Sequence, residues 1–116
     1  MRSVYLFAVL SVLSASQAPA QDGPKRITQH EATDACVHKI QPEYPNVARQ
    51  LKIQGVAELE AEITEDGSVE HVKTVSGSPV LTKAATEAFL KWKFKPFLEN
   101  GKPVRVVVAM SFTFSL

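Results

Sequence analysis

The sequence from Val104 to Leu116 reads VRVVVAMSFTFSL, and its side chains alternate between two kinds. Apolar residues take every second position: Val104, Val106, Val108, Met110, Phe112, Phe114 and Leu116. The positions between them hold mostly small or polar residues: Arg105, Val107, Ala109, Ser111, Thr113 and Ser115. A period of two with one apolar face predicts a β-strand that is buried on one side. The rest of the fold must cover that face.

This terminal strand is also expected to lie at the edge of its sheet. An edge strand presents unpaired N–H and C=O groups, which proteins usually protect with Lys, Pro, charges or bulges. Here only Arg105 and the flanking Pro103 are residues of that kind. The strand therefore predicts either an aggregation-prone edge or a binding edge that another strand can join.

Two further strands precede it. Ala57, Leu59, Ala61 and Ile63 alternate with Glu58, Glu60, Glu62 and Thr64, which predicts a half-buried strand with an acidic outer face. Glu65 to Ser68 contains Gly67 and predicts a tight turn. In the next strand the apolar residues Val69, Val72 and Val75 recur every three positions, which predicts a bulge.

Two helices complete the predicted fold. A helical stripe formed by Leu81, Ala84, Ala85, Ala88, Phe89 and Trp92 predicts one of them, ending before Pro96. A shorter helix is expected from Pro45 to about Lys52. Together these elements predict an α+β domain with a three-stranded antiparallel sheet, in the order second, first, last, and both helices on one face.

The N-terminus predicts a secretory signal at residues 1–20. Arg2 precedes an apolar run from Val4 to Leu13, and Ala18-Pro19-Ala20 has the small residues of a cleavage site. The run is short for a bilayer-spanning helix, which needs about 20 residues. We therefore expect a flexible leader at residues 21–36, a folded domain at 37–116 and an extracytoplasmic location, with an uncleaved inner-membrane anchor as the alternative.

Composition argues against several kinds of partner. The chain has 13 basic and 12 acidic residues, and removal of Arg2 with the signal leaves 12 of each. No segment is basic enough to predict binding to nucleic acid. Cys36 is the only cysteine, so no internal disulfide is expected, and the thiol is either free or paired with another molecule.

An enzyme is the weakest of the functional classes that the sequence suggests. Cys36 with His38 or His71 could form a nucleophile and base, and Cys36, His30 and His38 could bind a metal. A nucleophilic cysteine needs a base and an orienting group, and structural zinc usually needs four ligands. We expect no catalytic site, metal site or cofactor, and we interpret the alternating glutamates as a solvated face.

Short motifs are spread in a fixed order along the domain. They are Gln41-Pro42-Glu43-Tyr44-Pro45 with Ala48, Gly55-Val56, Asp66-Gly67 with Val69, Ser76-Gly77 with Leu81, Ala84-Ala85, Trp92-Lys93-Phe94 with Pro96, and Gly101. Together with the alternating terminal strand, this ordered set resembles the TonB C-terminal domain family. The resemblance covers roughly Val37 to Leu116.

The resemblance implies a periplasmic domain that pairs with the TonB box, a short extended segment of TonB-dependent outer-membrane receptors. In that family the box adds as a strand to the last strand of the sheet, near the segment before Pro-x-Tyr-Pro. Carried over to this sequence, the implied partner-binding residues are Gln41, Pro42, Tyr44, Arg105, Val106, Val107, Val108, Ala109, Met110, Ser111 and Phe112.

The resemblance also implies coupling to a proton-driven motor in the inner membrane. Energising members carry an N-terminal membrane helix with a Ser and a His, followed by a long proline-rich linker. This sequence has no His near Val4 to Leu13, and its leader is short. A stand-alone periplasmic adaptor that does not engage the motor subunits therefore stays open as an alternative, as does a homodimer formed by strand exchange.

Overall fold

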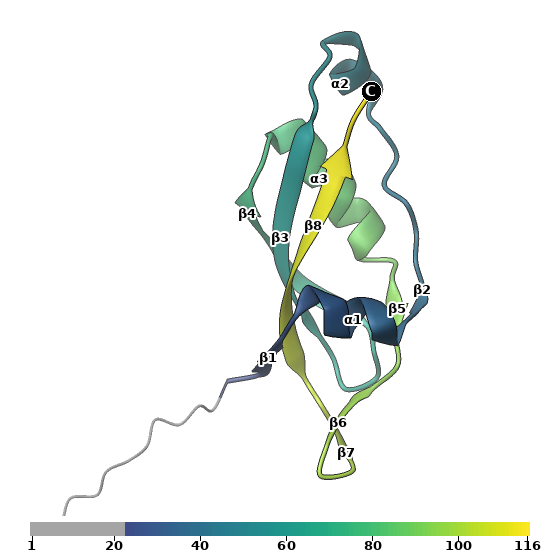
Figure 1. Cartoon of the computed structure of the whole chain (residues 1–116), viewed down its shortest axis with the longest axis vertical. Helices are drawn as coiled ribbons and strands as arrows, with labels where there is room; N and C mark the ends of the chain where they lie inside the picture. The colour runs from purple at the N-terminus through teal and green to yellow at the C-terminus, as the bar shows by residue number, and fades with distance from the viewer. Residues whose placement is uncertain (1–22) are drawn as a thin grey trace, which may run out of the picture.

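Four strands form the main sheet of the computed structural model, which describes residues 23–116 (Figure 1). In sheet order they are β1 (Lys25–Ile27), β8 (Val106–Phe114), β3 (Gly55–Ile63) and β4 (Val69–Ser76). β3 pairs antiparallel with both β4 and β8, whereas β1 pairs parallel with β8. The α+β class and the predicted order of the three long strands are confirmed. β1 is a fourth strand that the sequence pattern did not predict.

Three helices accompany the sheet: α1 (Gln29–Ala35), α2 (Asn46–Gln50) and α3 (Pro79–Phe89). α3 packs on β3 and β4, and α1 packs beside β8. α2 and α3 correspond to the two predicted helices, whereas α1 lies in the segment expected to be a flexible leader. That expectation is wrong for residues 25–35, which form β1 and α1. The signal peptide predicted for residues 1–20 lies outside the described residues.

The predicted alternation between Val104 and Leu116 is present in β8. Its five apolar positions are all buried, namely Val106, Val108, Met110, Phe112 and Phe114. Phe89 of α3 is fully buried, and its ring lies edge-on to Trp92 at 5.2 Å and to Phe112 at 5.5 Å between centroids. Offset and edge-to-face contacts of this kind add to the stabilisation from burial. Trp92 is thus a core residue, as its position predicted.

The turn predicted at Glu65 to Ser68 is present, and a second tight turn lies between β6 and β7. The β3–β4 hairpin turns at Gly67, which has φ +87°, and a Cβ there would lie 1.9 Å from the carbonyl oxygen of Phe94. Only glycine fits both the conformation and the space. Asn100 and Gly101 have φ values of 53° and 79° and join β6 (Phe97–Glu99) to β7 (Lys102–Val104). Paired positive φ values are typical of a two-residue hairpin loop.

The chain after α3 differs from the prediction. α3 ends at Phe89, well before Pro96, and β5 (Lys93–Phe94) then pairs with β2 (Cys36–His38). The indole N–H of Trp92 donates to the carbonyl of Ile40 at 2.9 Å. These contacts join residues 36–40 to residues 92–94. The helix ends before them because the backbone there pairs with β2 and does not continue the helical hydrogen bonds.

Candidate strand-docking edge

The outer side of β8 is identified by one hydrogen bond. The backbone N–H of Ser111 donates to Oε1 of Gln29 at 3.1 Å, on the side of β8 away from β3. The β3–β8 register is unbroken from Gly55 opposite Phe114 to Ile63 opposite Val106. The backbone N–H and C=O groups of successive residues in a strand point to opposite edges. Those of every second residue of β8 therefore point away from β3, to the outer edge. The outward-facing residues are Val107, Ala109, Ser111 and Thr113.

One half of this edge is already paired. Lys25, Arg26 and Ile27 of β1 lie opposite Val106, Val107 and Val108, respectively. The guanidinium of Arg26 forms an ion pair with the carboxylate of Glu60 on β3. Ile27 is half-buried and packs against the core. The expectation of an open edge is therefore wrong at Val106–Val108, because a segment remote in sequence supplies the missing backbone partners.

α1 continues this cover beyond β1. Thr28 is its N-cap: its side-chain oxygen accepts from the N–H of Glu31, and the Glu31 carboxylate accepts from the N–H of Thr28 at 2.9 Å. This reciprocal arrangement is a capping box. The bond from the Thr28 backbone, the largest of several contributions, lowers the pKa of Glu31. Ala32 is fully buried in the core, so the helix is anchored beside β8.

The other half of the edge borders a small cavity. This cavity, of about 170 Å³, lies between the segment at Gln41 and Pro42 and residues 110–113 of β8, with Gln29 at one end. Three of the sequence-predicted binding residues on β8, Met110, Ser111 and Phe112, line it. The structure therefore brings Gln41 and Pro42 next to the part of β8 that β1 does not pair.

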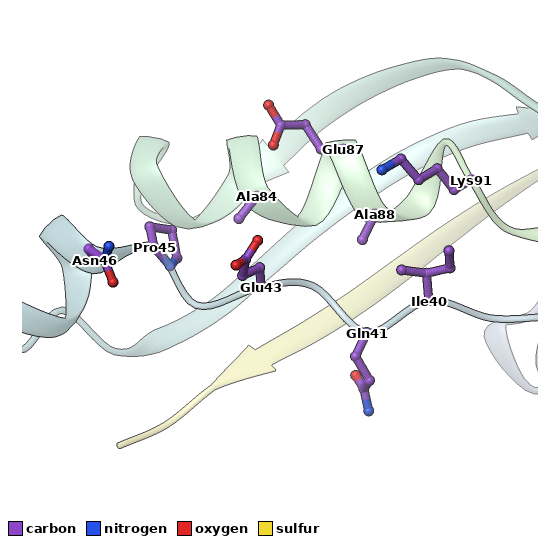
Figure 2. A pocket seen from close by; sticks show the side chains of 9 residues that line it. All are labelled: Ile40, Gln41, Glu43, Pro45, Asn46, Ala84, Glu87, Ala88 and Lys91. Atoms are coloured by element: carbon purple, nitrogen blue, oxygen red, sulfur yellow. The ribbon is translucent and has the colours of Figure 1, made fainter.

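Figure 2 shows the other side of the same segment. A second cavity of about 380 Å³ separates residues 40–46 from α3, with Ile40, Ala84 and Ala88 lining it alongside charged side chains such as Glu87 and Lys91. The extended segment thus has a cavity on each side, one towards α3 and one towards β8.

Tyr44 is one of those anchor points. Its hydroxyl donates to the carbonyl of Ile53, its ring lies edge-on to Phe114 at 5.5 Å, and the guanidinium of Arg49 lies 5.2 Å from its ring centroid. Each contact is within the chain. Tyr44, predicted as a binding residue, therefore holds the segment against the end of β8 in this structure.

The side chain of Arg105 is directed towards β3 and β4 and not towards the outer edge of β8. Its guanidinium donates to Glu62 at 2.8 Å and to Glu70 at 3.0 Å, which raises the pKa of Arg105. Glu62 and Glu70 lie directly opposite each other on β3 and β4. Like charges in that position are destabilising unless a cation lies between them. The structure thus gives Arg105 a role in the sheet and does not bring it to the cavity beside Gln41.

The sequence reasoning missed the residues that cover the edge: Arg26, Ile27 and Gln29. One signal was available, because Thr28 and Glu31 have the spacing of a capping box and so mark the start of a helix. The pairing of β1 has no comparable signal, since three residues are too few to establish a period. Its partner on β8 lies about 80 residues away, as the Gln29–Ser111 contact shows.

Most of the described chain matches a known protein family. The model of the Gram-negative bacterial TonB protein C-terminal family matches residues 40–116. The chain belongs to this family. The predicted family resemblance is thereby confirmed, and the match begins immediately before the segment that lies beside β8.

Individual relatives agree with this assignment. Protein TonB of Vibrio cholerae is 31% identical over 80 residues, which cover 67% of this chain and 33% of that protein. Protein TonB of Escherichia coli K12 is 29% identical over 79 residues, which cover 66% of this chain and 31% of that protein. The matched part therefore spans about a third of these relatives. A solution NMR structure of the Pseudomonas aeruginosa TonB CTD matches with a TM-score of 0.59 and 25% identity, over 70% of this chain and 84% of that one.

The described part of this TonB C-terminal domain has neither a cluster of metal ligands nor a membrane-spanning helix. Among residues 23–116, no group of three His, Cys, Asp or Glu side chains could hold a metal ion. Cys36 instead donates to the carbonyl of His38 at 3.3 Å, and His30 lies 3.4 Å from Asp34. Within the same described range, no helix has the length and apolar character needed to cross a bilayer.

Proposed function

We propose that this chain is a periplasmic TonB-like interaction module that takes up the TonB box of an outer-membrane receptor as a strand on β8. Its family membership supports a transport-related and non-enzymatic role of the TonB kind. Docking of the receptor segment would support transport across the outer membrane. The module would use backbone hydrogen bonds for affinity and side-chain fit for specificity.

One observation carries the proposal: the outer edge of β8 already pairs with an added strand. β1 joins it in register over Val106–Val108, although β1 comes from a distant part of the chain. The outer backbone groups of β8 are therefore able to pair with a strand from outside the hairpin, and such a strand already lies on Val106–Val108. Ala109, Ser111 and Thr113, the exposed residues on the outer face of β8, are small and leave room for a neighbour.

The proposed contact region runs along β8 to the segment at Gln41 and Pro42. In this arrangement Val107, Ala109 and Ser111 provide outward backbone groups, while Gln41 and Pro42 lie beside the far end of the visiting strand. The contribution of Val106, Val108, Met110 and Phe112 is indirect, because their buried side chains hold β8 on the core. Tyr44 and Arg105 fix the neighbouring elements.

A proline at Ala109 tests strand addition. Ala109→Pro removes an N–H on the outer side of β8, whereas Ala109→Ser keeps it and serves as the matched control. Binding of a synthetic TonB-box peptide is measured by calorimetry, after circular dichroism shows that both variants are folded. We expect the proline variant to bind at least tenfold more weakly than the serine variant. Equal affinities would exclude this edge as the docking site.

Coupling to the inner-membrane motor is a separate part of the proposal. Cell fractionation with an antibody against the domain measures where the chain resides. Recovery in the inner membrane together with the motor subunits supports an energy-transducing role. Recovery as a soluble periplasmic protein, with no motor subunit attached, supports the adaptor alternative and leaves the docking edge unchanged.

A further inference from the structure

The geometry points to β1 as a resident occupant of the docking edge, which a visiting strand must displace. This inference rests on the proposed function and adds a form of regulation to it. The leader segment Lys25–Gln29 would act as an internal competitor, so the affinity for a receptor segment is set partly by this chain's own sequence. β1 itself runs parallel to β8.

The two strands would compete for the same backbone groups. β1 occupies Val106–Val108, and the side chain of Gln29 occupies the N–H of Ser111. Of the outward-facing residues, only Thr113 lies beyond this stretch towards the C-terminus. A visiting strand of ordinary length pairs with five or so residues. It therefore overlaps β1 or Gln29 wherever it is placed on β8.

The hold of β1 on the edge is weak enough for exchange. The strand has three residues, and two of them, Lys25 and Arg26, are exposed. The side chain of Arg26 is 63% exposed, and ion pairs in such positions stabilise little. Segments with few buried apolar contacts open locally at low cost in free energy. Ile27, which is half-buried against the core, is the main apolar anchor.

The bound leader also indicates which side chains suit the edge. Arg26 lies on the outer face beside Glu60, whose carboxylate is also 3.4 Å from Lys73. Ile27 lies on the core face opposite Val108. A visiting strand in the same register as β1 would place an apolar side chain at the position of Ile27. At the position of Arg26 it would meet the carboxylate of Glu60.

Charge reversal at Arg26 tests the competition. Arg26→Glu places a carboxylate beside Glu60 and loosens β1, while Lys25→Glu makes the same change in net charge at a residue with no ion pair among residues 23–116. The affinity of each full-length variant for the synthetic TonB-box peptide is measured by calorimetry. Apparent affinity falls in proportion to the fraction of edges that are open. If one edge in ten is open in the parent, Arg26→Glu should bind more tightly, with a gain of about tenfold as the limit that is reached when every edge is open.

The outcomes separate the inference from the proposed function. Tighter binding by Arg26→Glu alone supports competition. If the parent and both variants bind the peptide equally, the leader is not a competitor, although the docking edge remains. If none of them binds, the proposed function fails, and a second probe then decides the inference. That probe is a synthetic peptide with the sequence of residues 23–29, which should bind Arg26→Glu and not the parent. Failure to bind either would overturn the inference.

Discussion

The two edges of the main sheet are protected in different ways. At β4 the protection is a bulge within the strand itself. Lys73 lies opposite Glu60 and Glu70 lies opposite Glu62, so the register shifts between them, and His71 in the bulge has φ 52°. Charged residues flank this bulge. At β8 the outer residues are small, and the protection comes from β1 and Gln29.

This difference teaches which edge can take part in binding. A bulge and its flanking charges are fixed parts of the strand and cannot be removed without a change of sequence. A separate segment can leave and return, since its pairing is a local equilibrium. The β4 edge is thus protected by the strand itself, whereas on our proposal the β8 edge is closed only while the leader is docked.

The largest effect is expected from a substitution on the inner side of β8, where the strand pairs with β3. Val108 is almost fully buried and lies opposite Ala61, so its N–H faces β3. Val108→Pro removes a hydrogen bond inside the sheet and should lower the free energy of unfolding by about 3 kcal/mol or more. Ala109→Pro, with its N–H on the outer side, should cost clearly less. Urea denaturation of both variants measures the contrast, and equal losses would contradict the assignment of outward-facing residues.

A smaller effect is expected at the β4 edge. His71→Val places a β-branched residue at a positive φ and should have a free energy of unfolding about 1–2 kcal/mol lower than that of His71→Gly. His71→Gly, which tolerates this conformation, is the matched variant and should be at least as stable as the parent in the same denaturation experiment. If valine is tolerated as well as glycine, the bulge does not depend on this backbone conformation.

The third prediction loosens the cover on β8. Thr28→Ala removes the side-chain oxygen that caps α1 and should destabilise that helix by about 1 kcal/mol. Thr33→Ala makes the same change at an exposed position within α1 and is the control. Amide hydrogen exchange should accelerate in residues 29–35 and at Ser111 in the Thr28 variant alone. Exchange that stays unchanged at Ser111 would show that the Gln29 contact does not depend on the helix.

The smallest effect is a loss of cover in acid. The pKa of Glu31 is lowered below its ordinary value of 4.5, chiefly by the bond from the Thr28 N–H, so the folded leader favours the carboxylate. The stabilisation is therefore present above 4.5 and is lost as the pH falls through the lowered pKa. Amide exchange of residues 29–35 should accelerate in that range.

Glu31→Gln provides the control for this pH dependence. Glutamine can still accept the capping hydrogen bond and does not titrate. Its exchange rates, corrected for the intrinsic effect of pH, should show no step in the acidic range. A step that persists in this variant would assign the pH dependence to another carboxylate, such as Asp66, whose pKa is also lowered, chiefly by the hydroxyl of Thr64.

Much of the domain was predictable because its signals are periodic and local. The alternation in β8, the stripe of α3 and the turn at Gly67 each depend on residues close together in sequence. Their order then restricted the topology of the three long strands to one arrangement. The same reasoning extended α3 towards Pro96, because the aromatic core residue Trp92 continues a helical spacing beyond the helix itself.

The candidate site was only partly predictable. Gln41 and Pro42 line the same cavity as Met110–Phe112, and their role in binding a partner stays a prediction. Tyr44 and Arg105 make contacts elsewhere. Tyr44 donates to the carbonyl of Ile53, and Arg105 donates to the carboxylates of Glu62 and Glu70. A list of residues from a motif cannot state which of them face a partner.

The sequence by itself determined the three long strands, their order and the family, since hydrophobic periodicity and turn chemistry act over a few residues. Only the tertiary structure decided that the edge of β8 is occupied, by a three-residue strand that carries no pattern of its own. Backbone hydrogen bonding is nearly independent of side-chain identity, so any nearby extended segment can fill an open edge. Which segment lies nearby depends on how the whole chain is folded.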